Sequence, residues 1–209
     1  MKLAILCESP ADAAAVRILV NAILGEPTEM TDDPLLSPRG WPAVLNVLPS
    51  VLKYLYYRTD ADSLVVVVDA DKSPVHEPDH DEPDSSLDQC KVCLLRTAIQ
   101  QTEMGLKPVA GRLPIKTAIG LAVPAMEAWY LCGIEPQATE AALRLSPGAS
   151  LREIKLHLKQ AVYATSRPPL EHATARAVEE ATRLAQDLEL LEQLFPDGFG
   201  TLARDVRSW

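Results

Sequence analysis

The chain has 209 residues, of which 47% are hydrophobic and 5% aromatic, and its formal net charge is −9. This length fits one domain, or one domain with a helical appendage. Because the apolar runs are far shorter than the roughly 20 residues that cross a bilayer, and because the chain does not open like a signal peptide, we expect a cytoplasmic protein without a membrane segment. The acidity is concentrated in residues 60–90, which hold ten acids against one base, and it argues against a protein that coats nucleic acid by charge alone.

The first two thirds of the chain alternate continuous apolar runs with segments of helical periodicity. Such runs are typical of strands buried on both faces, and they lie at residues 3–7, 63–68 and 115–123. Helical spacing of apolar residues is found at residues 10–24, 42–58, 86–104 and 124–129. Strands joined by helices pair in parallel, so the sequence predicts an α/β fold with a small parallel sheet flanked by helices.

After Gly133 the pattern becomes purely helical. Helices are expected at residues 135–145, 151–164 and 170–195, and a final amphipathic segment follows a Pro-Asp-Gly turn. We therefore expect an α/β core in residues 1–133 and a helical C-terminal extension in residues 134–209 that packs on it.

Acidic side chains follow the first two predicted strands. Glu8 ends the first, and Asp69 and Asp71 end the second. The carboxyl ends of parallel strands meet at one crevice, and alternate residues of an extended segment point the same way, so we expect these three acids to converge. Carboxylate oxygens in such a group suit Mg²⁺ or Mn²⁺. The alternative is that these acids are only turn formers and helix caps.

The segment Ile5-Leu6-Cys7-Glu8, the helix that contains Asp12, and the segment Val67-Val68-Asp69-Ala70-Asp71 together resemble a Toprim domain. This is the metal-binding module of topoisomerases, primases and OLD-type nucleases. The likeness covers about the first 130 residues and is greatest to small stand-alone Toprim-like proteins of unknown function, some of which lie beside ATPases in bacterial defence loci.

The resemblance implies a role for each acid. Glu8 would be a metal ligand and the general acid or base, and Asp69 and Asp71 would bind Mg²⁺. In the stand-alone proteins a segment like Pro-Ala-Met-Glu-Ala-Trp supplies a further acid, which here is Glu127. One departure is that Toprim domains usually place Gly after the Glu, where this chain has Ser9.

A metal at these acids would polarise a phosphoryl oxygen and activate water. Lys72, which directly follows Asp71, and Lys116 are candidates to offset negative charge on a phosphate. Together with these acids, the resemblance implies a metal-dependent phosphodiester-cleaving enzyme of the nuclease type that acts on nucleic acid, with a role in bacterial defence. Two alternatives stay open: a phosphohydrolase acting on nucleotides, and a non-catalytic binding module that works with a partner such as an ATPase.

A second candidate metal site lies in the acidic stretch. His76, His80, Cys90 and Cys93 form the pattern H-x3-H-x9-C-x2-C, and both pair spacings match those of zinc ligands. Alternatively, the two cysteines face the core from a helix and the two histidines are solvated. If zinc binds, it would fasten the acidic loop beside the carboxylates.

Overall fold

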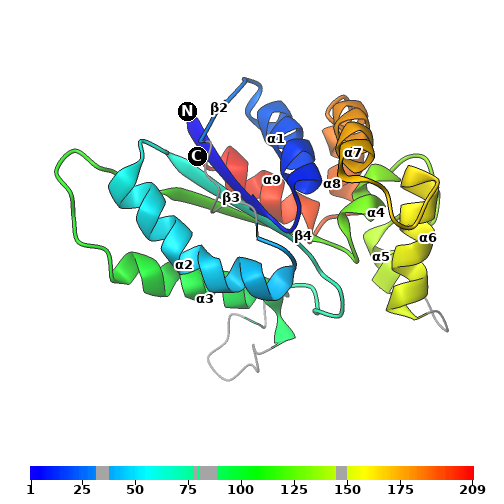
Figure 1. Ribbon diagram of the computed structural model, residues 1–209, viewed down its shortest axis with the longest axis horizontal. Coiled ribbons are helices and arrows are strands. Elements are labelled where there is room, and N and C mark those ends of the chain that lie inside the picture. Colours follow the sequence, from blue (N-terminus) through cyan, green and yellow to red (C-terminus); the bar gives the residue numbers. More distant parts are fainter. Residues whose placement is uncertain (32–37, 78–79, 81–88, 145–149) are drawn as a thin grey trace.

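The computed structural model describes residues 1–31, 38–77, 80, 89–144 and 150–209 (Figure 1). Within these residues the centre of the molecule is a parallel sheet with strand order β2-β1-β3-β4. The strands are β1 (Lys2–Cys7), β2 (Glu29–Met30), β3 (Ser63–Asp69) and β4 (Lys116–Ala122). The predicted α/β fold with a small parallel sheet flanked by helices is therefore confirmed. The strand that sequence patterning missed, β2, has two residues, too few to show a pattern.

The register of the strands sets where the sheet ends. Cys7 pairs with Val67, and Asp69 pairs with Ala122. The segments that leave β1, β3 and β4 at their carboxyl ends therefore start from one edge of the sheet. This edge carries the predicted acids.

Helices cover both faces of the sheet (Figure 1). Alternate residues of β1 separate into two cores: Leu3, Ile5 and Cys7 pack on one face, and Ala4 and Leu6 on the other. The first face is covered by α1 (Pro10–Leu24) and α9 (Phe199–Arg207), with α7 (Leu170–Leu184) packed on α1, and the second by α2 (Trp41–Arg58) and α3 (Lys91–Met104). Burial on both faces explains why the strands are continuous apolar runs.

Local signals fix the ends of α1 as predicted. The Ser9 side chain accepts a hydrogen bond from the Asp12 backbone N–H, and Gly25 closes the helix in the left-handed conformation with φ 72°. The helix that was expected to begin at residue 86 has a different start in the structure, where α3 begins at Lys91. Residues 86–88 lie outside the described residues.

Two of the predicted C-terminal helices need correction. The helix expected at 170–195 is divided into α7 and α8 (Leu188–Leu194), because the Asp187 side chain accepts from the Leu190 N–H and starts a new helix. The helix expected at 135–145 begins at Glu140 as α5 (Glu140–Arg144), where Thr139 Oγ1 accepts from the Ala142 N–H. Residue 145 lies outside the described residues.

The remaining helices bring the C-terminal part onto the sheet. The short helix α4 (Met126–Tyr130) follows β4, and α6 (Leu151–Tyr163) packs against it. Trp129 of α4 meets Phe199 of α9 edge to face, with ring centroids 5.3 Å apart, and both side chains are fully buried. Along the described residues, no helix combines the length and apolarity needed to cross a membrane.

Candidate metal-binding sites

The carboxylates at the sheet edge are joined by backbone hydrogen bonds. Glu8 Oε1 accepts from the Asp69 N–H at 3.0 Å, and Asp69 Oδ1 accepts from the Met126 N–H at 3.0 Å. Asp71 adopts φ 52°, so the chain turns sharply after β3. The ends of β1 and β3 and the start of α4 are thus held together by two acids.

Two lysines neutralise the Asp69-Ala70-Asp71 segment. Lys155 Nζ lies 2.9 Å from Asp69 Oδ2 and 2.5 Å from Asp71 Oδ1. Lys91 Nζ lies 2.7 Å from Asp71 Oδ2 and donates to the Asp69 carbonyl at 2.6 Å. Asp69 and Asp71 therefore lie side by side, as expected. Lys155 of α6 lies between the two carboxylates, and Lys91 of α3 lies on the other side of Asp71.

The lysines named from sequence lie elsewhere. Lys72 is exposed and lines a surface hollow with residues of α6. Lys116 starts β4 opposite Ser63, at the other end of the sheet from Asp69, and its Nζ donates to the Trp209 carbonyl. Sequence analysis did not identify Lys155 as a site residue. Its only signal in the sequence is its position on the basic face of α6, one turn before Lys159.

A hollow of about 470 Å³ opens beside these acids. Its lining includes the acids Glu8, Asp12, Asp69 and Glu127, the cations Lys159 and Arg167, and Tyr163. Glu127 is only 8% exposed, and Lys159 Nζ is 4.0 Å from its Oε1. The structure thus brings three of the four predicted carboxylates to one hollow, adds Asp12 to them, and places Asp71 next to Asp69.

Crowding of the acids changes their pKa values. Burial, followed by the nearby charge of Asp69, raises the pKa of Glu8 and of Glu127, and the same two causes raise that of Asp12 to about 7. For Asp71, burial opposes ionisation, but hydrogen bonds from Lys155 and Lys91 outweigh it and lower the pKa. The raised pKa values show that the acids of the hollow disfavour one another's ionisation, and a hard divalent cation with oxygen ligands would relieve this repulsion.

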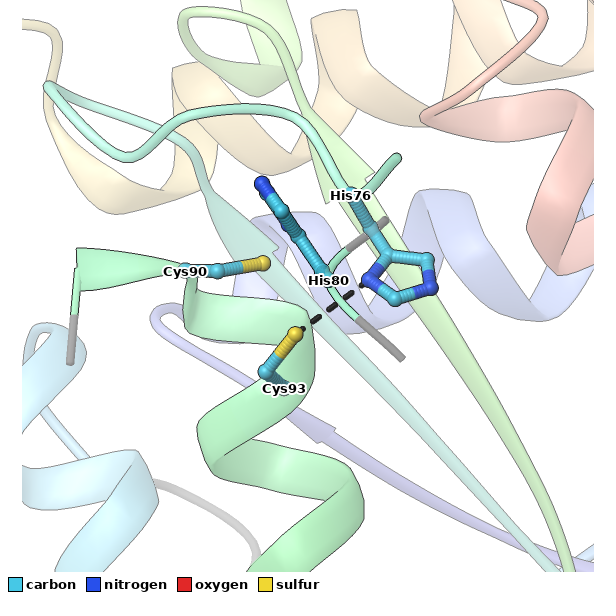
Figure 2. A group of neighbouring side chains, drawn as sticks. All are labelled: His76, His80, Cys90 and Cys93. Carbon is cyan, nitrogen blue, oxygen red and sulfur yellow. Dashed lines mark hydrogen bonds between the residues drawn. The ribbon is translucent and has the colours of Figure 1, made fainter. Parts of the chain in front are cut away.

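The second candidate site is the group of His76, His80, Cys90 and Cys93 (Figure 2). One candidate ligand atom from each residue lies within 4.8 Å of all the others. The cysteines are buried and belong to the start of α3, while the histidines are half-buried in the segment after β3. This group could hold a metal ion, so the four residues predicted from spacing are brought together by the fold.

Hydrogen bonds fix the His76 ring. Arg96 Nη1 lies 2.6 Å from His76 Nε2, and because a guanidinium only donates, Nε2 is the acceptor. His76 Nδ1 therefore carries the proton and donates to Cys93 Sγ at 3.2 Å (Figure 2). A metal bound at Nδ1 would require the ring proton to move to Nε2, which would then no longer accept from Arg96, so metal binding would displace the Arg96 side chain.

Comparison of the chain with protein-family models, with curated proteins and with solved structures finds no match. Function therefore has to be argued from the geometry of the two sites.

Proposed function

We propose that this chain is a divalent-metal-dependent, phosphodiester-cleaving protein of the nuclease type, as its likeness to Toprim domains implies. The observation that supports the proposal is the shared hollow of Glu8, Asp69 and Glu127 at the carboxyl ends of parallel strands, with Asp71 beside Asp69. Open α/β sheets bind their ligands at this edge. Nucleic acid is the proposed substrate class.

In this proposal Asp69, Asp71, Glu8 and Glu127 would hold Mg²⁺ or Mn²⁺, and the ion would supply polarisation of a phosphoryl oxygen and activation of water. Glu8, whose pKa is raised by burial and by the charge of Asp69, would be the general acid or base, as the resemblance implies. Lys159, on the rim of the hollow, provides a positive charge for the phosphate.

The chain offers a matched pair of variants to test this activity. Replacing Asp69 and Asp71 with alanine is expected to lower Mn²⁺-dependent cleavage of single- and double-stranded nucleic acid by about a hundredfold or more, since the metal ligands are lost. The control replaces Asp60 and Asp62, the same Asp-Ala-Asp sequence at the amino end of β3. Equal cleavage by wild type and the first variant would contradict the proposal.

A second candidate function is a non-catalytic binding module that keeps the fold and acts with a partner such as an ATPase. The observation that favours it is that Lys155 and Lys91 already neutralise Asp69 and Asp71. In this case the two lysines replace the cation permanently.

Substitution of Lys155 separates the two candidates. If Asp69 and Asp71 bind a cation, Lys155 competes with it, so Lys155→Met is expected to bind Mn²⁺ about tenfold more tightly than wild type in an electron paramagnetic resonance titration. Arg152→Met removes the same charge from α6 without touching the two acids, and is expected to bind Mn²⁺ like wild type. No Mn²⁺ binding by any of the three proteins favours the binding module.

We also propose that the ion of the His76, His80, Cys90 and Cys93 group is Zn²⁺, because two thiolates and two imidazoles are a zinc ligand set. All four cysteines of the chain are free, which suits a protein of the reducing cytoplasm. Metal analysis of the purified protein should find about one zinc ion per chain, and a chain that takes up none after incubation with ZnCl₂ contradicts this assignment.

A further inference from the structure

Among the described residues, the N-cap residue of α3 provides no side-chain cap, as is also the case for α2, α4, α7 and α9. Ser9 caps α1, and Ser150 forms a capping box with Glu153 on α6. At α3 the N-cap residue is Cys90, and within the described part of the chain its side chain makes no capping hydrogen bond. The Lys91 N–H instead donates to Ser73 Oγ at 2.9 Å, so this helix end depends on the segment that follows β3.

Lys91 adds an electrostatic difficulty to this helix end. It is the first residue of α3, where the positive end of the helix dipole disfavours a cation, and the first turn contains no acid. Its side chain is nonetheless only 8% exposed and bonds to the Asp69 carbonyl and to Asp71 Oδ2, with Nζ 4.9 Å from the centre of the Trp41 ring. A helix end that is held by Ser73, and not by its own N-cap residue, therefore positions the buried amine that bonds to both aspartates.

The His/Cys group lies across this same junction (Figure 2). Cys90 and Cys93 bracket Lys91 on α3, while His76 and His80 belong to the segment that contains Asp71 and Ser73. An ion held by all four would join the two segments that Lys91 also joins. Thiolate ligands at the first turn would also place negative charge at the positive end of the helix dipole.

We propose that zinc held by His76, His80, Cys90 and Cys93 fastens the first turn of α3 to the segment after β3, and thereby keeps Lys91 bridged between Asp69 and Asp71. In this role Lys91 is a positioning residue for the carboxylate site, and the zinc site is structural. The inference rests on the proposed zinc assignment, and it is independent of whether the protein cleaves phosphodiesters.

Chemical labelling of lysine amines measures the position of Lys91 directly. The full-length protein is loaded with ZnCl₂ or treated with a chelator, then acetylated briefly and analysed by mass spectrometry. Lys91 is expected to be protected in the zinc form and to react about fivefold faster or more without zinc, because removal of the ion releases a buried amine. Lys53, which is exposed on α2, is the internal reference and is expected to react equally in both forms.

Variants separate the effect of zinc from that of the chelator. Cys93→Ser in the presence of ZnCl₂ is expected to label at Lys91 like the chelated wild type, while Cys132→Ser, which changes a buried cysteine elsewhere, labels like the zinc form. His80→Asn removes a ligand without altering α3. It replaces Cys93→Ser in this experiment if circular dichroism shows that Cys93→Ser does not fold. Equal labelling of Lys91 with and without bound zinc overturns the inference alone, whereas a protein that binds no zinc overturns it together with the zinc assignment. Loss of cleavage activity bears on neither.

Discussion

Gly198→Ala is expected to destabilise the protein by about 3 kcal/mol or more in urea unfolding. Gly198 precedes α9, and its φ of −84° is open to any residue, so space rather than backbone conformation makes it necessary. A methyl group at this position would lie 2.2 Å from the carbonyl oxygen of Leu121 in β4. Because the clash is with strand backbone, α9 would have to move away from the sheet that it covers.

Gly200→Ala provides a matched control two residues later. A methyl group there would meet the carbonyl oxygens of Glu192 and Phe195 at 3.7 Å, an ordinary contact distance. Gly200 lies within α9, where alanine is the better helix former by up to about 1 kcal/mol, so this variant is expected to equal or exceed wild type in stability. If both variants unfold at the same urea concentration, the close packing of Gly198 on β4 is contradicted.

The sheet and its acidic edge could be predicted because their signals are local. Continuous apolar runs that end in Glu8 and Asp69 gave strands buried on both faces, and parallel pairing then placed both acids at one edge. The start of α1 could be predicted in the same way, because a serine at the N-cap followed by a proline at the first helical position is a local signal for the start of a helix. Each of these inferences needs only neighbouring residues and one topological rule.

The lysines of the site could not be predicted, because their partners are distant in sequence. Lys155 lies 86 residues after Asp69, and Lys91 lies 20 residues after Asp71. A lysine on an amphipathic helix is most often a solvated charge, and only tertiary packing shows that these two meet acids. The same limit applies to the break between α7 and α8, where the local cap at Asp187 outweighed a continuous apolar pattern.

The group of acids in the hollow should itself limit stability, and Asp12 gives the largest measurable effect. Its carboxyl group is half-buried on α1, accepts a hydrogen bond from Ser9 Oγ at 2.7 Å, and has its pKa raised to about 7 by burial and by Asp69. The unfolded chain has a pKa of about 3.9 at this residue. Between these two values Asp12 binds more protons in the folded protein than in the unfolded chain, so its contribution to stability falls as pH rises from about 4 to about 7 and is constant above that.

Asp12→Asn is therefore expected to be more stable than wild type by about 2–4 kcal/mol at pH 8 and nearly equal to it at pH 4, in urea unfolding without added divalent cation. Asparagine does not ionise, and its amide oxygen still accepts from Ser9. Glu189→Gln, which changes an exposed acid on α8, is expected to follow the wild-type pH profile. A constant difference between Asp12→Asn and wild type across this pH range would show that Asp12 is ionised throughout.

Mg²⁺ extends this experiment to function. If the cation binds the acids of the hollow, it neutralises the charges of Asp69 and Glu8 that raise the pKa of Asp12, so the advantage of Asp12→Asn at pH 8 should shrink when Mg²⁺ is added. If Lys91 and Lys155 replace the cation permanently, as in the non-catalytic module, the advantage stays unchanged. In the non-catalytic module the repulsion among these acids would lower stability, and no ligand would offset it. In a metal-dependent enzyme the same group of acids lowers the stability of the metal-free protein but also provides the ligands that bind the metal.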